Sequence, residues 1–92
     1  MHGDEVRYIR KQVIGLNQDD FARLIGVSRG TVWSWENGRT SVPELQAGII
    51  KQLEQEAKRR DDTEEWARKL LALAVGGFFG IMLAKLFSND ES

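Results

Sequence analysis

The sequence contains no cysteine, one proline and one histidine among its 92 residues. Without cysteine, neither a disulfide framework nor a thiolate metal site is available. The single histidine, His2, lies beside the first residue, where we expect a solvated terminus. The sequence offers no nucleophile–base pair, no cluster of metal ligands and no separate ligand-sensing domain. We therefore expect no enzyme activity, no metal or other cofactor, and no small-molecule ligand.

The chain also lacks an excess of positive charge. Its 13 Lys and Arg residues are set against 14 Asp and Glu residues, which gives a net charge of −1. This balance counts against a strong nonspecific binder of nucleic acid. The length suffices for one small domain with an appendage, and a domain this short has a marginal core that oligomerisation often supplements.

Residues 17–38 predict two short helices joined by a tight turn. Asn17 is a favoured N-cap residue, and apolar residues recur at helical spacing behind it. Gly26 stands where the turn needs a residue that accepts positive φ, and Ser28 offers a second N-cap. The second helix then runs to Gly38.

The residue types inside this unit are those that two closely crossing helices require. Ala22 is small where the two helices cross closely, and Val27, Val32 and Trp35 are apolar where the crossing is buried. Together with Gln18, Gly26 and the closing Glu36–Gly38, they resemble the helix-turn-helix family of phage repressors and Cro, the XRE group. The resemblance covers roughly residues 5–57. It implies an all-α bundle of four or five helices, with the second motif helix presented to the DNA major groove.

The outer side of the second motif helix holds the candidates for DNA contact. With Val32 and Trp35 inward, a helix turning about 100° per residue directs a different set of residues outward. The fork of Arg29, in the first turn, suits guanine O6 and N7. The candidates for base contact are Arg29, Gly30, Thr31, Trp33 and Ser34.

Three of these candidates leave alternatives open. Gly30 costs a helix about 1 kcal/mol relative to Ala, so it either permits close approach to nucleic acid or is neutral. Thr31 either contacts a thymine methyl or closes the first turn, and we favour the second. Trp33 can pack on the sugar or a thymine methyl, anchor a protein partner as Trp often does, or pack on the fourth helix.

The resemblance also implies contacts to phosphates and one ion pair. Gln18 and Asn37 match family positions that hydrogen-bond phosphates, and Arg39 adds positive charge. Arg10 matches an arginine that pairs with the glutamate closing the recognition helix, here Glu36. Acidic residues offset the basic ones within residues 18–40, so one unit should bind DNA weakly and two units are needed.

Helices are expected on both sides of this unit. Residues 5–14 predict an amphipathic helix that Gly15 ends. Ser41 and Glu44 suggest a capping box, with Pro43 in the first turn of a fourth helix. The buried stripe of that helix is expected at Leu45, Ile49, Ile50 and Leu53. Apolar residues at helical spacing end at Leu53, and a charged stretch follows. We therefore place a DNA-binding domain at residues 1–60.

Residues 61–92 predict a hydrophobic C-terminal helix that runs to about Phe87. Residues 70–84 contain no polar side chain, so the helix has no polar face. Small residues recur at every fourth position, a pattern that allows two helices to approach closely. They are Ala72, Gly76, Gly80 and Ala84.

Three interpretations of this helix are kept, in this order of preference. The first is a membrane span over residues 66–87, about 22 residues across a ~30 Å core. More Lys and Arg precede than follow it, so the domain would be cytoplasmic and tethered to the inner face of the membrane. The second is an oligomerisation helix that gives a dimer or a larger assembly. The third is a helix packed on its own domain.

The sequence thus predicts a cytoplasmic protein that binds double-stranded DNA sequence-specifically as a homodimer, acting as a repressor or a similar regulator. The alternative is a membrane-anchored adaptor whose helix-turn-helix unit binds protein. Balanced charge and Trp33 favour the adaptor, whereas Arg29, Gln18 and Asn37 favour the regulator.

Overall fold

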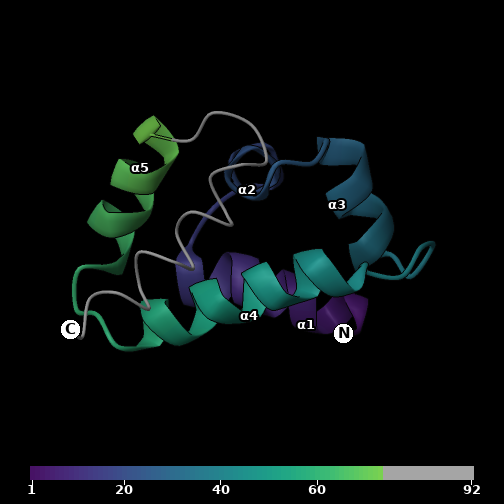
Figure 1. The fold of residues 1–92 in the computed structure, drawn as a ribbon, viewed down its shortest axis with the longest axis horizontal. Helices are drawn as coiled ribbons and strands as arrows, with labels where there is room; N and C mark the ends of the chain where they lie inside the picture. The colour runs from purple at the N-terminus through teal and green to yellow at the C-terminus, as the bar shows by residue number, and fades with distance from the viewer. Residues whose placement is uncertain (74–92) are drawn as a thin grey trace.

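The structure, a computed structural model, describes residues 1–73. All regular elements in this range are helical, which confirms the all-α prediction. Figure 1 shows the long helix α4 along one side of the molecule, with α2 and α3 across from it. The elements are α1 (Gly3–Tyr8), the π-helical segment η1 (Ile9–Ile14), α2 (Gln18–Ile25), α3 (Arg29–Glu36), α4 (Glu44–Lys58) and α5 (Thr63–Leu73).

The first helical segment differs from the single α-helix expected at residues 5–14. It begins at Gly3 and changes to a π-helix at Ile9. A π-helical turn closes with i→i+5 hydrogen bonds, as between Gly15 N and Arg10 O at 2.8 Å. The sequence spacing predicts Val6, Ile9 and Val13 on the inward side of a single α-helix. The wider turn shifts this side by one residue, so that Ile14 is buried in the core while Val13 is only half-buried.

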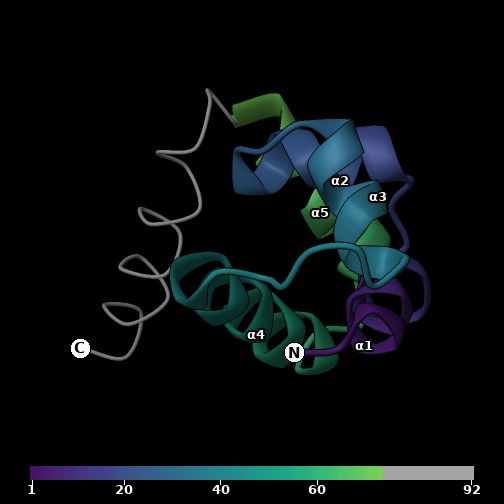
Figure 2. The ribbon, with the colours of Figure 1, turned by 90° about the vertical axis from the view of Figure 1, so that its right-hand side faces the viewer.

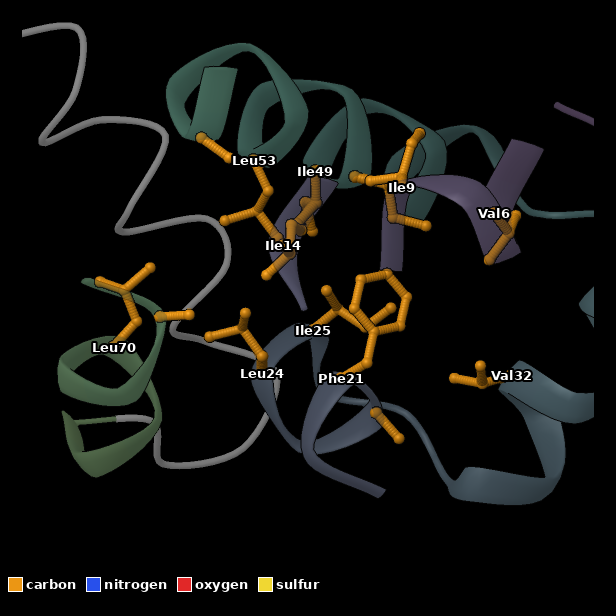
Figure 3. Packing of buried hydrophobic residues seen from close by; sticks show 14 of the residues in the cluster. Val6, Ile9, Ile14, Phe21, Leu24, Ile25, Val32, Ile49, Leu53 and Leu70 are labelled. Carbon is orange, nitrogen blue, oxygen red and sulfur yellow. The ribbon is translucent and has the colours of Figure 1, made fainter. Parts of the chain in front are cut away.

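The core lies where α2 meets η1, α3 and α4. Figure 3 shows the ring of Phe21 pointing from α2 toward Ile9, with Val32 and Leu24 on either side of it. Phe21, Ile9, Leu24 and Val32 are fully buried. Burial of each such side chain contributes about 1.5–3 kcal/mol.

The start of α4 corrects two expectations. The helix begins at Glu44 with Pro43 as its N-cap and no side-chain capping bond, so the predicted capping box is wrong. A box with Ser41 as N-cap needs Val42 to be helical, and the residue before a proline is forced out of the helical region. Leu45 is consequently in the first turn and is 57% exposed. Its expected stripe partners Ile49, Ile50 and Leu53 are buried, as predicted.

Helix α5 packs on the domain. Its residues Trp66, Ala67 and Leu70 are buried in the same core cluster, and α5 contacts α2 and η1. In Figure 1, α5 and α3 lie on opposite sides of α2, and in Figure 2, which is viewed from the α3 side, α5 is seen behind α2 and α3. Residues 63–73 thus follow the third interpretation of the C-terminal segment.

The remaining small residues of the C-terminal pattern, Gly76, Gly80 and Ala84, lie outside the described residues. Ala72 is described and exposed. Within residues 1–73, no helix is both long enough and apolar enough to cross a membrane.

Candidate nucleic-acid interface

The turn between α2 and α3 has the predicted geometry. Asn17 caps α2, with its side-chain oxygen accepting from Asp20 N at 2.7 Å. Gly26 takes the left-handed conformation at φ 79°, and its N–H donates to Ala22 O at 2.9 Å. Ser28 Oγ then caps α3 by accepting from Thr31 N at 3.1 Å. These local bonds fix the angle at which α3 leaves α2.

Helix α3 presents one side to the core and the other to solvent. Val32 and Trp35 are buried, as predicted, and Ala22 is buried beneath α3 on α2. The opposite side is open to solvent. Among the predicted DNA contacts, Arg29, Gly30, Trp33, Asn37 and Arg39 are exposed, and Gln18, Thr31 and Ser34 are half-buried.

A buried ion pair fixes the C-terminal end of α3. The Glu36 carboxylate has no exposed side-chain surface and accepts from Arg10 Nε at 2.6 Å and Arg10 Nη2 at 3.0 Å. Gln18 Nε2 donates to the same carboxylate at 3.1 Å. This arrangement confirms the Arg10–Glu36 pair that the resemblance implied, and it joins η1, α2 and α3.

The protonation of Glu36 follows from these partners. Burial raises the pKa of Glu36, but the hydrogen bonds from Arg10 and Gln18 and the charge of Arg10 outweigh burial. The pKa is therefore lowered from its ordinary value of 4.5. Glu36 is charged at neutral pH, and both partners of the pair keep their hydrogen bonds.

Two residues that the sequence analysis did not single out also hold the end of α3. Arg7 Nη2 donates to Glu36 O at 3.3 Å, and Arg7 Nε lies 3.5 Å from Glu36 Oε1. A Cβ on Gly3 would lie only 2.3 Å from Trp35 O, so only glycine allows α1 to meet α3 this closely. The three-residue spacing of Arg7 and Arg10 is the signal that places both on one helix face.

The predicted phosphate-binding amides are partly engaged within the protein. Gln18 Nε2 donates to Glu36, and Asn37 Nδ2 donates to Trp33 O at 2.9 Å. Each amide nitrogen carries two hydrogens, so each retains one N–H for an outside acceptor. The Thr31 hydroxyl lies 2.9 Å from the Ser28 hydroxyl, which fits the turn-closing role that we favoured.

Acidic side chains neutralise part of the positive charge on this face. Arg29 Nε lies 4.0 Å from Asp19, and Arg23 Nη1 lies 3.5 Å from Asp20. No acidic side chain within residues 1–73 pairs with Arg39, whose guanidinium carbon lies 5.4 Å from the centre of the Trp33 ring. Of the three arginines Arg23, Arg29 and Arg39, Arg39 is thus the one without a nearby carboxylate among the described residues.

Across residues 1–73, no group of three or more His, Asp and Glu side chains could hold a metal ion. The polar side chains of the α2–α3 face include the cations Arg29 and Arg39 and the amides Gln18 and Asn37, which can donate hydrogen bonds to an anionic or polar surface.

Comparison with known families agrees with this geometry. Residues 6–47 match the helix-turn-helix family model, a DNA-binding regulatory domain family. The chain matches no curated protein and no solved structure.

Proposed function

Because residues 6–47 form a helix-turn-helix domain, we propose that the chain binds double-stranded DNA sequence-specifically and regulates transcription. In this proposal α3 enters the major groove, and the N-terminal end of α2 lies against the phosphate backbone. The observation that carries the proposal is the contrast between the two sides of α3.

The inward side of α3 is anchored at both ends. Ser28 caps its first turn, and the Arg10–Glu36 pair holds its last turn against η1. The outward side carries the exposed residues Arg29, Trp33 and Asn37. A rigidly held helix with a solvent-exposed face is what groove recognition requires, because base contacts lose affinity when their support moves.

Each outward residue has a proposed role. Arg29 donates to guanine O6 and N7, and Gly30 lets the helix approach the base edges. Trp33, Ser34 and Thr31 line the same side. Gln18, Asn37 and Arg39 bind phosphates, which position the domain without reading sequence.

We further propose that the chain acts as a homodimer or larger assembly. The pairs Arg29–Asp19 and Arg23–Asp20 reduce the charge that one copy offers to phosphates. Two copies on half-sites about 34 Å apart would combine two weak contacts into one specific complex. The sequence predicts a DNA-binding domain at residues 1–60 and a separate helix at 61–92, but α5 packs on the domain. Residues 74–92 are therefore the candidate assembly segment.

The test is selection of duplexes from a randomised pool by the full chain, followed by affinity measurements on the recovered site. We expect Arg29→Ala to lose about 1–3 kcal/mol per copy and to relax the preference at one base pair. Lys69→Ala is the control, since Lys69 is equally exposed, pairs with Glu65 and lies on α5, across α2 from α3. Equal losses in both variants, or no enriched site, would contradict the proposal.

The second candidate is an adaptor, membrane-anchored or not, that uses the same domain to bind protein. The 44% exposed Trp33 and the balanced charge favour it. Fractionation of cells that express the full chain, with light scattering of the soluble part, separates the possibilities. A detergent-dependent membrane protein that enriches no duplex would support the adaptor, and a soluble dimer that selects a site would support the regulator.

A further inference from the structure

The turn after α3 directs the chain back along the helix. Gly38 has φ 71°, and its N–H donates to Trp35 O at 3.1 Å. The N–H of Arg39 donates to Ser34 O at 2.8 Å. This pair of bonds is a Schellman motif, which fixes the backbone of the residue that follows the glycine. Arg39 is therefore held beside the last turn of the recognition helix.

This backbone position places the Arg39 side chain over Trp33. Its guanidinium carbon lies 5.4 Å from the centre of the indole ring, within the range of a cation–π contact. The helix turn beneath the indole is also fixed, because Trp33 O accepts from both Asn37 N at 3.0 Å and Asn37 Nδ2 at 2.9 Å. Trp33 and Arg39 form one exposed unit at the C-terminal end of α3.

The contact with Trp33 differs from the contacts of the neighbouring arginines. Arg23 and Arg29 each lie within 4.0 Å of a carboxylate, which cancels part of their charge. An aromatic ring orients a guanidinium without cancelling its charge. Arg39 is thus restrained before binding but still fully positive toward an outside anion.

We propose that Trp33 is a positioning residue that holds Arg39 ready for a DNA phosphate at the edge of the major groove. This inference rests on the proposed DNA binding and assigns Trp33 a role apart from base contact. An unrestrained arginine loses rotamer entropy when it binds a phosphate. Because Trp33 already restrains Arg39 in the unbound domain, less entropy is lost on binding. The indole therefore strengthens binding through Arg39.

A double-mutant cycle on the selected duplex tests the coupling. The chains compared are the wild type, Trp33→Leu, Arg39→Ala and the double variant, each measured at several salt concentrations. Arg39→Ala should reduce the slope of log K against log salt by about 1 for each bound copy. Trp33→Leu should weaken binding about two- to fivefold per copy, the effect of one exposed cation–π contact. In the Arg39→Ala background, the same change should have no effect beyond error.

Trp33→Phe provides the matched control because it retains an aromatic ring under Arg39. It should retain most of the affinity that Trp33→Leu loses. Urea unfolding of each variant confirms that the exposed substitutions leave the fold intact.

Other results would overturn the inference in distinct ways. Equal weakening by Trp33→Leu with and without Arg39 would make Trp33 a direct DNA contact. No weakening in either background would mean that the ring contact has no role in binding. In both cases the wild type still binds its site, so the proposed function survives. A chain that selects no duplex at all overturns both proposals.

Discussion

Arg10 and Glu36, 26 residues apart in the chain, form a buried two-point ion pair with N···O distances of 2.6 and 3.0 Å. The pair connects the π-helical segment η1 to the last residue of α3. Arg10 also donates from Nη1 to Leu16 O at 3.0 Å, so the same side chain fixes the loop before α2. One buried side chain thus sets the position of both helices of the motif.

Breaking this pair from one side should be costly. Arg10→Met and Glu36→Leu should each lower the free energy of unfolding by about 3–5 kcal/mol, because each removes the nearest opposite charge from a buried ionised side chain. The double variant should lose less than the sum of the two. Urea unfolding followed by circular dichroism measures all three, and strictly additive losses would show that the two residues do not interact.

The pair also predicts how stability depends on pH. Because the folded-state pKa of Glu36 is lowered, its stabilisation is complete above the ordinary value of 4.5 and is lost as the pH falls through the folded value. Glu36→Gln should therefore flatten the fall in unfolding free energy on the acidic side.

Glu5→Gln is the control for this pH prediction. The hydrogen bond from Lys51 lowers the pKa of Glu5 too, but that pair is exposed. Its removal should leave most of the acidic slope in place. If the acidic slope of the unfolding free energy disappeared with Glu5→Gln and persisted with Glu36→Gln, the acid sensitivity would come from the Lys51–Glu5 pair, which would contradict this prediction.

Gly30 offers a change that separates folding from binding. An added Cβ would lie 3.8 Å from Ser28 Oγ, an ordinary contact, so Gly30→Ala should stabilise the domain by up to about 1 kcal/mol. If α3 approaches DNA closely there, the same methyl should cost about 1–3 kcal/mol in binding. Gly48→Ala in α4, where the added Cβ meets nothing within 4 Å, should stabilise equally and leave affinity unchanged. Undiminished affinity of Gly30→Ala would place this residue away from the groove.

Trp66 tests whether α5 belongs to the folded unit. Trp66 is only 6% exposed and packs in the core, so Trp66→Ala should lower the free energy of unfolding by about 3–5 kcal/mol. Lys69→Ala on the exposed side of α5 should change it by less than about 0.5 kcal/mol. A chain ending at residue 60 should likewise be less stable than one ending at residue 73. Equal stability of those two chains would show that α5 adds nothing to the domain.

The motif could be predicted from sequence because its determinants are local. Asn17, Gly26 and Ser28 specify caps and a turn within a few residues of themselves, and the structure shows each in that role. The buried side of α3 followed from helical periodicity alone. The Arg10–Glu36 pair required the family resemblance, since nothing local brings these residues together.

The features that sequence reasoning missed depend on distant contacts or on backbone detail. The π-helical segment shifts the inward side by one residue, and no residue in it marks that change. The capping box failed because the effect of Pro43 on Val42 outweighed the Ser41–Glu44 pattern. The packing of α5 on α2 and η1 ranked last among the three interpretations because residues 70–84 form a uniformly apolar run, whereas Trp66, Ala67 and Leu70 are the residues of α5 that are buried in the core.

The most direct test of the central claim uses the selected duplex with each guanine replaced in turn by 7-deazaguanine. This base pairs normally but lacks the N7 acceptor that an arginine fork requires. The account predicts one position at which the wild type loses about 1–3 kcal/mol and Arg29→Ala loses nothing. No sensitive guanine, or an equal loss in Arg29→Ala, would contradict major-groove recognition by α3 through Arg29.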